Sequence, residues 1–377
     1  VKSATNALKA MGVKYFSKRI DTTLRGGVGV EVDAMLDQLN EDTVAVVVPA
    51  MPQSRRILVG GYSVIDGVAL INTPVAQDVR TPVKENYIPR LLAGQTRRKV
   101  GLVTLDQVLK GKDGIKEALT EVRNDGAGVI IVDAITLEDV DRIAQACIDL
   151  DWDVVAVDPG PFTSKLAYRR GLIQEEQPNV PPAASEEGKT VLIAAGSATP
   201  VTKKQMQVLC EDSRHVRISV EPIPLINEAL DEAFKAVNKA VELIESSKQP
   251  RAILFETALH GDLLNLDEED KKRGYAGGMS ANRINAGLGT IISQVLEQVG
   301  REKIAGLYTT GGDTMVNVCY QLGVECIEVM DYVIPQTDVG RLVGKYDGLP
   351  VVGKGGLTGN DNTACDIVER LFKESAR

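Results

Sequence analysis

The 377-residue chain has no block of clustered lysines and arginines, and it has no long apolar run. Its net charge is -9 and its pI is about 5.1, whereas nucleic-acid backbones and anionic membranes bind proteins through clustered basic side chains. The sequence therefore argues against nucleic acid and membrane as partners. No apolar stretch would span a bilayer and no secretory signal is evident, so a cytoplasmic location is expected.

Cysteine and histidine are too few and too scattered to indicate a metal centre. The cysteines are odd in number and contain no C-x-x-C pair, which argues against a disulfide framework and a zinc site. His215 and His260 are the only histidines, and neither has a second ligand at metal spacing, so surface or structural roles are expected. We expect reduced, partly buried thiols at Cys147, Cys210, Cys319, Cys326 and Cys365.

The chain does contain short β-branched runs that alternate with helical patterns. This alternation predicts an α/β fold in which each of two domains has a largely parallel sheet flanked by helices. The predicted strands are residues 44–48, 100–104, 128–132 and 154–157 in the first domain, and 191–195, 252–255, 304–309, 326–330 and 351–352 in the second. Apolar spacing predicts helices at 202–212, 227–246, 280–299 and 361–372.

A segment rich in proline and glutamate separates the two sets of strands. Residues 171–189 contain Pro178, Pro181 and Pro182 and show no periodic apolar face. We therefore expect a first domain over residues 1–172, a linker over 173–189 and a second domain over 190–377. Because ligands commonly bind between domains, we expect a ligand cleft between these two. The chain starts at Val1 and enters a helical pattern at once, which suggests that an amino-terminal piece is missing.

In the second domain, Gly311-Gly312-Asp313-Thr314 follows a predicted strand and precedes a helical pattern at 315–322. Glycine lets backbone N–H groups approach a ligand closely, and the start of a helix favours an anion. Asp313 and Thr314 are then placed to touch a metal or a phosphate. A tight turn with Asp313 as helix cap explains the same residues equally well.

Two further loops of this domain have a similar composition. Residues 353–359 contain four glycines and Lys354, a point charge that can reach a phosphate, although the spacing is not that of a P-loop. A flexible solvent loop is the alternative. Residues 195–199 form the other loop, and since parallel strand ends line one edge of a sheet, convergence of all three loops favours phosphate binding. The candidates in these two loops are Gly196, Ser197, Thr199, Lys354, Gly355, Gly356 and Gly359.

In the first domain, polar side chains gather at residues 18–27, ahead of a helical pattern at 30–39. Arginine can grip a carboxylate through two hydrogen bonds, while aspartate and threonine bond to hydroxyls, which suits a small polyhydroxy acid. An ordinary capped loop with solvated charges is the alternative. Residues 49–56 follow the strand at 44–48 and form a rigid turn that places Arg56 at the same edge. The candidates are Lys18, Asp21, Thr22, Arg25, Gly26 and Arg56.

The order of these segments resembles the four-carbon acid sugar kinase family, formerly a family of unknown function, over nearly the whole chain. Residues 18–26 resemble its K-x-D-S-T-L-R-G segment, and residues 49–56 resemble its P-A-F-P-x-x-G-R segment. Asp78 with residues 81–83 resembles its D-P-x-x-P-V stretch. Residues 196–197, 311–314 and 354–359 resemble its G-S, G-G-[DE]-T and K-S-G-x-F-G loops.

The resemblance implies a sugar-binding first domain and a nucleotide-binding second domain. It further implies phosphorylation, with ATP and Mg²⁺, of the terminal hydroxyl of a sugar acid such as threonate, erythronate or an oxo-tetronate. Asp21, Thr22, Arg25 and Arg56 would hold the acid, and the three glycine loops would hold ATP. Asp313 would bind the metal or deprotonate the hydroxyl. A nonenzymatic sensor of a sugar acid or nucleotide is the alternative function, and a homo-oligomer is left open.

The sequence departs from the family pattern at four places. The family begins with a strand that ends in Asp-Asp-x-Thr-Gly-Ala, but this chain contains no Asp-Asp pair. The first domain is therefore expected to lack its amino-terminal strand. Arg55 replaces a glycine, Gly27 replaces a common asparagine, and Thr358 replaces an aromatic residue. These changes are expected to alter substrate or nucleotide preference.

Overall fold

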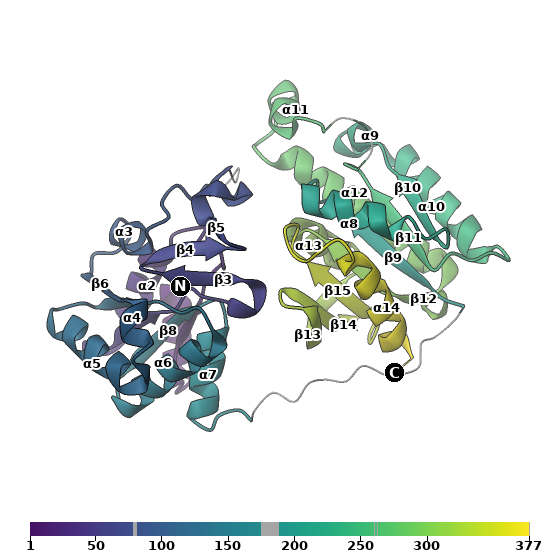
Figure 1. Cartoon of the computed structure of the whole chain (residues 1–377). Helices are drawn as coiled ribbons and strands as arrows, with labels where there is room; N and C mark the ends of the chain where they lie inside the picture. Colours follow the sequence, from purple (N-terminus) through teal and green to yellow (C-terminus); the bar gives the residue numbers. More distant parts are fainter. Residues whose placement is uncertain (78–80, 175–187, 260, 262, 377) are drawn as a thin grey trace. The chain divides into compact units, whose positions relative to one another are not determined.

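The computed structural model describes residues 1–77, 81–174, 188–259, 261 and 263–376, and the chain forms two compact units (Figure 1). Both units are α/β structures with a sheet flanked by helices, so the predicted fold class is confirmed. The units divide at residues 177 and 178. Most of the predicted linker lies outside the described residues, as do Asp78 and His260, and the linker bounds stay a prediction.

The first unit combines a five-stranded sheet, a three-stranded sheet and helices. Its elements are α1 (Lys2–Ala10), β1 (Ser17–Arg19), α2 (Val28–Leu36), β2 (Val44–Val47), η1 (Pro52–Ser54), β3 (Arg56–Val59), β4 (Tyr62–Ile65), β5 (Val68–Ala69), η2 (Leu70–Asn72), η3 (Pro74–Gln77), α3 (Ile88–Ala93), β6 (Val100–Val103), α4 (Leu105–Val108), α5 (Gly111–Asn124), β7 (Val129–Val132), α6 (Leu137–Asp149), β8 (Val154–Asp158) and α7 (Pro161–Arg169). The large sheet is parallel in the order β1-β8-β2-β7-β6, and β3-β4-β5 is antiparallel.

Both faces of the large sheet are buried. Val44 and Val46 of β2 pack with residues of α4 to α7, whereas Ala45 and Val47 pack with residues of α2 and α3. Figure 1 shows α4 to α7 grouped together beside this sheet. Because successive strand residues point to opposite faces and each face has its own helices, the strands read in the sequence as continuous β-branched runs.

The second unit is built on a seven-stranded mixed sheet. Its elements are β9 (Thr190–Ala195), α8 (Pro200–Leu209), β10 (His215–Ser219), α9 (Pro222–Ile226), α10 (Leu230–Glu245), β11 (Ala252–Glu256), α11 (Leu266–Arg273), α12 (Met279–Val299), η4 (Arg301–Lys303), β12 (Ile304–Thr310), α13 (Gly312–Gln321), β13 (Val324–Ile334), β14 (Thr337–Gly344), β15 (Pro350–Lys354) and α14 (Thr363–Ser375). The order is β10-β11-β9-β12-β15-β14-β13, and β14 is antiparallel to both of its neighbours, β15 and β13. Helices α9, α10, α12 and α13 contribute to the core on one face, and α8 and α14 to the core on the other.

Several strands escape prediction from the sequence. Strands β1 and β10 lie at sheet edges, where one side is solvated, and they carry Lys18 and Arg217 in place of a continuous apolar run. Strand β14 and the small β3-β4-β5 sheet are likewise not among the predicted strands. His215 lies in β10 with Nδ1 2.8 Å from the carbonyl oxygen of Leu209, a structural role.

The structure shows the state of the cysteines, the grouping of possible metal ligands and the apolar character of the helices. All five cysteines are free, and Cys147 is buried while Cys326 is exposed. Among the described residues, no group of three or more His, Cys, Asp or Glu side chains is arranged to hold a metal ion. In the same part of the chain, no helix is both long enough and apolar enough to cross a membrane.

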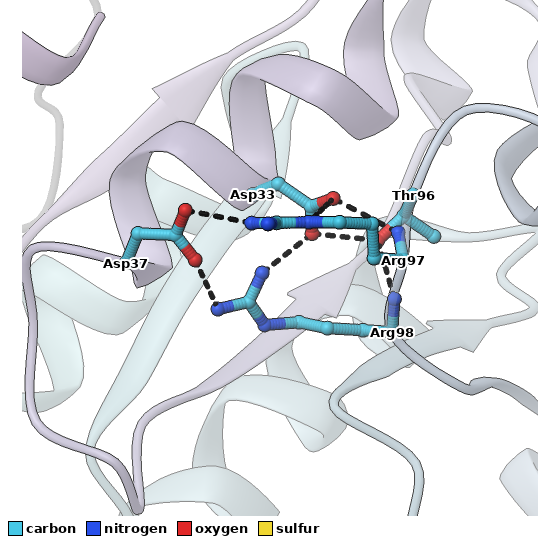
Figure 2. A network of polar contacts seen from close by, with 5 residues as sticks. All are labelled: Asp33, Asp37, Thr96, Arg97 and Arg98. Carbon is cyan, nitrogen blue, oxygen red and sulfur yellow. Dashed lines mark hydrogen bonds and ion pairs between the residues drawn. The ribbon is translucent and has the colours of Figure 1, made fainter.

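Helix α2 is anchored by a network of charged side chains (Figure 2). Asp33 accepts hydrogen bonds from Thr96 Oγ1 (2.7 Å), from the backbone N–H of Arg97 (2.9 Å) and from Arg98 Nη1 (2.6 Å). Asp37, one turn later, accepts from Arg97 Nη2 and Arg98 Nη2. Burial raises the pKa of Asp33, but these hydrogen bonds outweigh burial and hold its pKa below the ordinary value.

Replacing Asp33 with alanine is expected to lower the free energy of unfolding of the first unit by about 2 kcal/mol, because partly buried donors lose their acceptor. Trp152 is the only tryptophan and lies in this unit, so its fluorescence in urea reports the change. The folded pKa of Asp33 lies below the unfolded one, so the stabilisation is complete above about pH 4 and is lost as pH falls through the lowered pKa. Asp37→Ala, at the more exposed end of the network, should lower the midpoint of urea unfolding less than Asp33→Ala does. An unchanged midpoint for Asp33→Ala would contradict the role of the network.

Candidate functional site

Three glycine-containing loops lie next to one another at the carboxyl edge of the second sheet. Strands β9, β12 and β15 are adjacent and parallel, and Ala195, Thr310 and Lys354 at their ends are in register. Each strand leads through a glycine-containing loop into a helix, α8, α13 or α14 respectively. The structure thus brings together the three loops that the sequence singled out, at the edge where ligands bind in parallel α/β sheets.

The first and third loops are tied by direct hydrogen bonds. The hydroxyls of Thr199 and Thr202 both donate to the backbone oxygen of Gly356, the second at 3.1 Å. Thr199 is also the N-cap of α8. A Cβ at Gly356 would overlap with Ser197 Oγ, so the two backbones approach more closely than a side chain would allow.

The second loop opens α13 without a side-chain cap. Gly311 is the N-cap residue, has a φ of 105°, and donates from its backbone N–H to the carbonyl oxygen of Lys354 at 2.9 Å. Asp313 is exposed and lies in the first turn of the helix, after the N-cap residue, so its interpretation as the helix cap is wrong. The first N–H groups of a helix have no acceptor within the helix, and they carry its partial positive charge. This turn therefore has the geometry of an anion site.

Lys354 is the last residue of β15, and its side chain turns onto the third loop. Its Nζ donates to the carbonyl oxygens of Gly355 (2.8 Å) and Thr358 (3.3 Å), and the residue is only 3% exposed. The lysine thus forms hydrogen bonds within the loop as well as giving it a positive charge. Burial lowers the pKa of Lys354 to about 8.

Polar residues outside the loops also hold the cluster together. Gln205 of α8 is fully buried and donates from Nε2 to the carbonyl oxygens of Thr358 (3.0 Å) and Asn360 (2.8 Å). Gln205, Thr202 and Asn285 are not among the predicted site residues, because they come from helices and not from glycine loops. A polar residue next to apolar residues on the buried face of a helix, such as Gln205 beside Met206, is the signal that would have found them. Gly359, at the end of the third loop, has a φ of 90°.

In the first unit, the segments after β1 and β2 lie at the same sheet edge because both strands pair with β8. Asp21 Oδ2 accepts hydrogen bonds from Arg25 Nε (2.7 Å) and from Thr23 Oγ1. Leu24 is buried and has a φ of 59°, and Gly26 has a φ of 91°. A buried leucine in the left-handed region is uncommon, and such strain concentrates at functional sites.

Asp21 remains ionised in this turn. Burial raises its pKa, but the hydrogen bonds from Arg25 and Thr23 outweigh burial and leave the pKa below its ordinary value. The carboxylate is therefore a hydrogen-bond acceptor at neutral pH. Thr22, half-buried, lies in the same turn.

Arg56 begins β3 and is the more unusual of the two neighbouring arginines. Its Nη1 donates to the carbonyl oxygen of Ser54 at 3.1 Å, whereas its buried Nε has no acceptor within the described part of the chain. Burial lowers the pKa of Arg56, while the charges of Asp66 and Asp21 raise it. A buried, unsatisfied guanidinium nitrogen is costly in isolation and suits an anionic ligand.

Arg55 occupies the position where the family pattern has glycine. Its φ is 55°, in the left-handed region that glycine adopts without strain. This left-handed backbone explains why the family pattern has glycine at the position. With arginine there, the turn before Arg56 keeps the same conformation. Lys18, another predicted substrate contact, has partners within the protein. Its Nζ lies 2.6 Å from Glu31 Oε2 and donates a hydrogen bond to the carbonyl oxygen of Arg19.

Comparisons with known proteins match both units. Residues 1–166 match a family model described as a sugar-binding N-terminal domain, and residues 192–364 match one described as a nucleotide-binding C-terminal domain. A crystal structure from Salmonella typhimurium shares the fold with a TM-score of 0.72 at 16% identity, covering 96% of this chain and 82% of that chain. A Haemophilus influenzae structure gives a TM-score of 0.64 at 21% identity, covering 99% and 84%.

Two curated relatives match along most of their length. The chain is 35% identical over 374 residues to D-erythronate kinase of Heliobacterium modesticaldum, covering 99% of this chain and 83% of the relative. It is 29% identical over 354 residues to D-threonate kinase of Salmonella typhimurium, covering 93% of this chain and 79% of the relative. The chain belongs to the four-carbon acid sugar kinase family.

Proposed function

We propose that this protein is a kinase that uses ATP to phosphorylate the terminal hydroxyl of a four-carbon sugar acid, of the threonate, erythronate or oxo-tetronate class. The observation that carries this proposal is the set of three tied glycine loops at the carboxyl edge of the second sheet. The relatives named D-erythronate kinase, D-threonate kinase and 3-oxo-tetronate kinase support the substrate class.

The acid binds in the first unit. Arg56 offers a buried nitrogen without an acceptor in the described residues, and its guanidinium pairs with the substrate carboxylate. Asp21, held ionised by Arg25, accepts hydrogen bonds from substrate hydroxyls. Thr22 and the open backbone at Gly26 complete the set of substrate contacts.

ATP binds in the second unit. Backbone N–H groups of the first turn of α13 and the glycines of the third loop receive the phosphates, and the charge of Lys354 assists them. Asp313 is the carboxylate in the first turn of α13, which fits Mg²⁺ because this ion is commonly held by one or two carboxylates together with substrate phosphates. When bound, Mg²⁺ would neutralise charge on the phosphates. Asp313 either ligates Mg²⁺ or accepts the proton of the attacking hydroxyl.

The proposal is tested by measuring ADP release with ATP, Mg²⁺ and a panel of D-erythronate, D-threonate and 3-oxo-tetronate. ADP release that depends on one of these acids is the expected result. ATP binding without acid-dependent ADP release would contradict the kinase proposal and favour the sensor. Release with other small hydroxy acids alone would correct the substrate class.

The catalytic efficiency for ATP is expected to fall above about pH 8, by up to about tenfold per pH unit. Burial lowers the pKa of Lys354 to about 8, so its positive charge is present below that pH and is lost above it. In Lys354→Arg the charge persists, and the decline should disappear. The measurement is kcat/KM for ATP as a function of pH in both proteins. A profile for the unchanged protein that stays flat through pH 8 would contradict the role of this lysine.

A further inference from the structure

Asn285 is a buried polar residue of a helix, and it lies between apolar residues on the buried face of that helix. It lies in α12 and is 8% exposed, while Ile284 and Leu288 beside it pack into the core. Burying an amide costs free energy unless its polar atoms find partners. The partner is Thr314 of α13, 2% exposed, whose hydroxyl donates to Asn285 Oδ1 at 2.8 Å.

The pair lies directly against the first glycine loop. A Cβ at Gly196 would overlap both with Asn285 Oδ1 and with Thr314 Oγ1. The backbone after β9, helix α12 and the first turn of α13 therefore meet at one point. Neither Gly196 nor Thr314 has room to shift without disturbing the other, so this contact fixes the first loop relative to the second.

Other contacts also hold the two helices together. Apolar residues of α12 and Val318 of α13 belong to one core cluster. At Gly289 the two helices come so close that a Cβ would lie 2.8 Å from the backbone oxygen of Asn317. Apolar side chains at both positions of a buried hydrogen bond commonly keep the stability of a fold. The polar pair thus adds directional placement of Thr314, which packing does not supply.

We infer that Asn285 is a positioning residue of the nucleotide site. It holds Thr314, and with it the first turn of α13, in register with the loop at Gly196, so that donors of both loops meet the same phosphate chain. This inference rests on the proposed function, because it takes the ligand of these loops to be ATP. Asn285 acts through Thr314 and is not itself assigned a contact with ATP.

Asn285→Ala is expected to raise the Kd for ATP about tenfold, since a misplaced first turn loses part of a charge-assisted hydrogen bond. The KM for the sugar acid should stay unchanged. Thr314→Val removes the same hydrogen bond from the other side with little change in shape, and keeps the test open if Asn285→Ala fails to fold. The double variant should have about the same Kd for ATP as the single variant that binds ATP less tightly, because the losses of affinity at two coupled residues do not add.

Asn282→Ala is the matched control, one turn earlier on the same helix. Asn282 is exposed, and its Oδ1 accepts from Asn317 Nδ2 of α13 at 3.2 Å, so this variant also removes a bond between the two helices. Its Kd for ATP should equal that of the unchanged protein. If Asn285→Ala binds ATP with the Kd of the unchanged protein, or if the two single variants lose ATP affinity additively in the double variant, the positioning role would be overturned while the proposed function stays intact. Failure of the unchanged protein to bind ATP would overturn both.

Discussion

Gly312→Ala should raise the Kd for ATP about 100-fold without lowering the melting temperature, because a methyl group would push a phosphate away from charge-assisted backbone donors. The fold itself does not require glycine there. Gly312 is the first residue of α13, its φ is not positive, and no described atom lies within 4 Å of the position that a methyl group would take. Alanine is favoured over glycine in helices, so the variant should be as stable as the unchanged protein or slightly more stable.

The measurement is calorimetric titration with ATP, accompanied by thermal unfolding. Gly277→Ala is the control, because Gly277 lies in the same unit, has no positive φ, and is equally open to a Cβ. It should bind ATP normally. If Gly312→Ala also binds ATP normally, the phosphates do not approach the first turn of α13.

Arg56→Gln is expected to lower kcat/KM for the sugar acid by about 100-fold, because two charge-assisted hydrogen bonds to the carboxylate are lost. The KM for ATP should not change, since Arg56 is assigned to the acid and the glycine loops are assigned to ATP. Steady-state kinetics with each substrate varied in turn separates the two effects. Arg56→Lys should recover only part of the loss, because an ammonium does not form the paired contact.

The adjacent arginine provides a control with the same charge change. The Arg55 side chain is 76% exposed and its Nε lies 3.1 Å from Asp66 Oδ1, a contact at the surface. Surface ion pairs contribute little, so Arg55→Gln should retain nearly full activity. Equal losses in Arg55→Gln and Arg56→Gln would indicate a general electrostatic effect and would contradict the assignment of Arg56 to the carboxylate.

The buried strands and the convergence of the glycine loops were open to prediction from the sequence. Strands β2, β7 and β9 are buried along their whole length, so their β-branched runs are unambiguous. The loops lie at one edge because parallel strands present their carboxyl ends there, whereas the adjacency of β9, β12 and β15 comes from the sheet order of the structure. The short edge strands β1 and β10 lack this signal, because solvated edges tolerate charged residues.

The sequence could not predict the tertiary contacts that order the candidate site. Whether Lys354 reaches outward or bonds to its own loop depends on the path of residues 355–358 and not on its position next to glycine. The left-handed conformations of Leu24 and Arg55 are imposed by the turns around them, against the preference of each residue. Asn285 and Gln205 reach the loops from helices, so their roles appear only when the helices are packed.

A crystal structure of the protein with a nonhydrolysable ATP analogue tests the central claim most directly. Phosphate oxygens within hydrogen-bond distance of the backbone N–H of Gly312, and beside the loop at Gly356, are the expected result. Binding of the phosphates away from Gly311, Gly312 and Gly356 would contradict the assignment of these loops to the nucleotide.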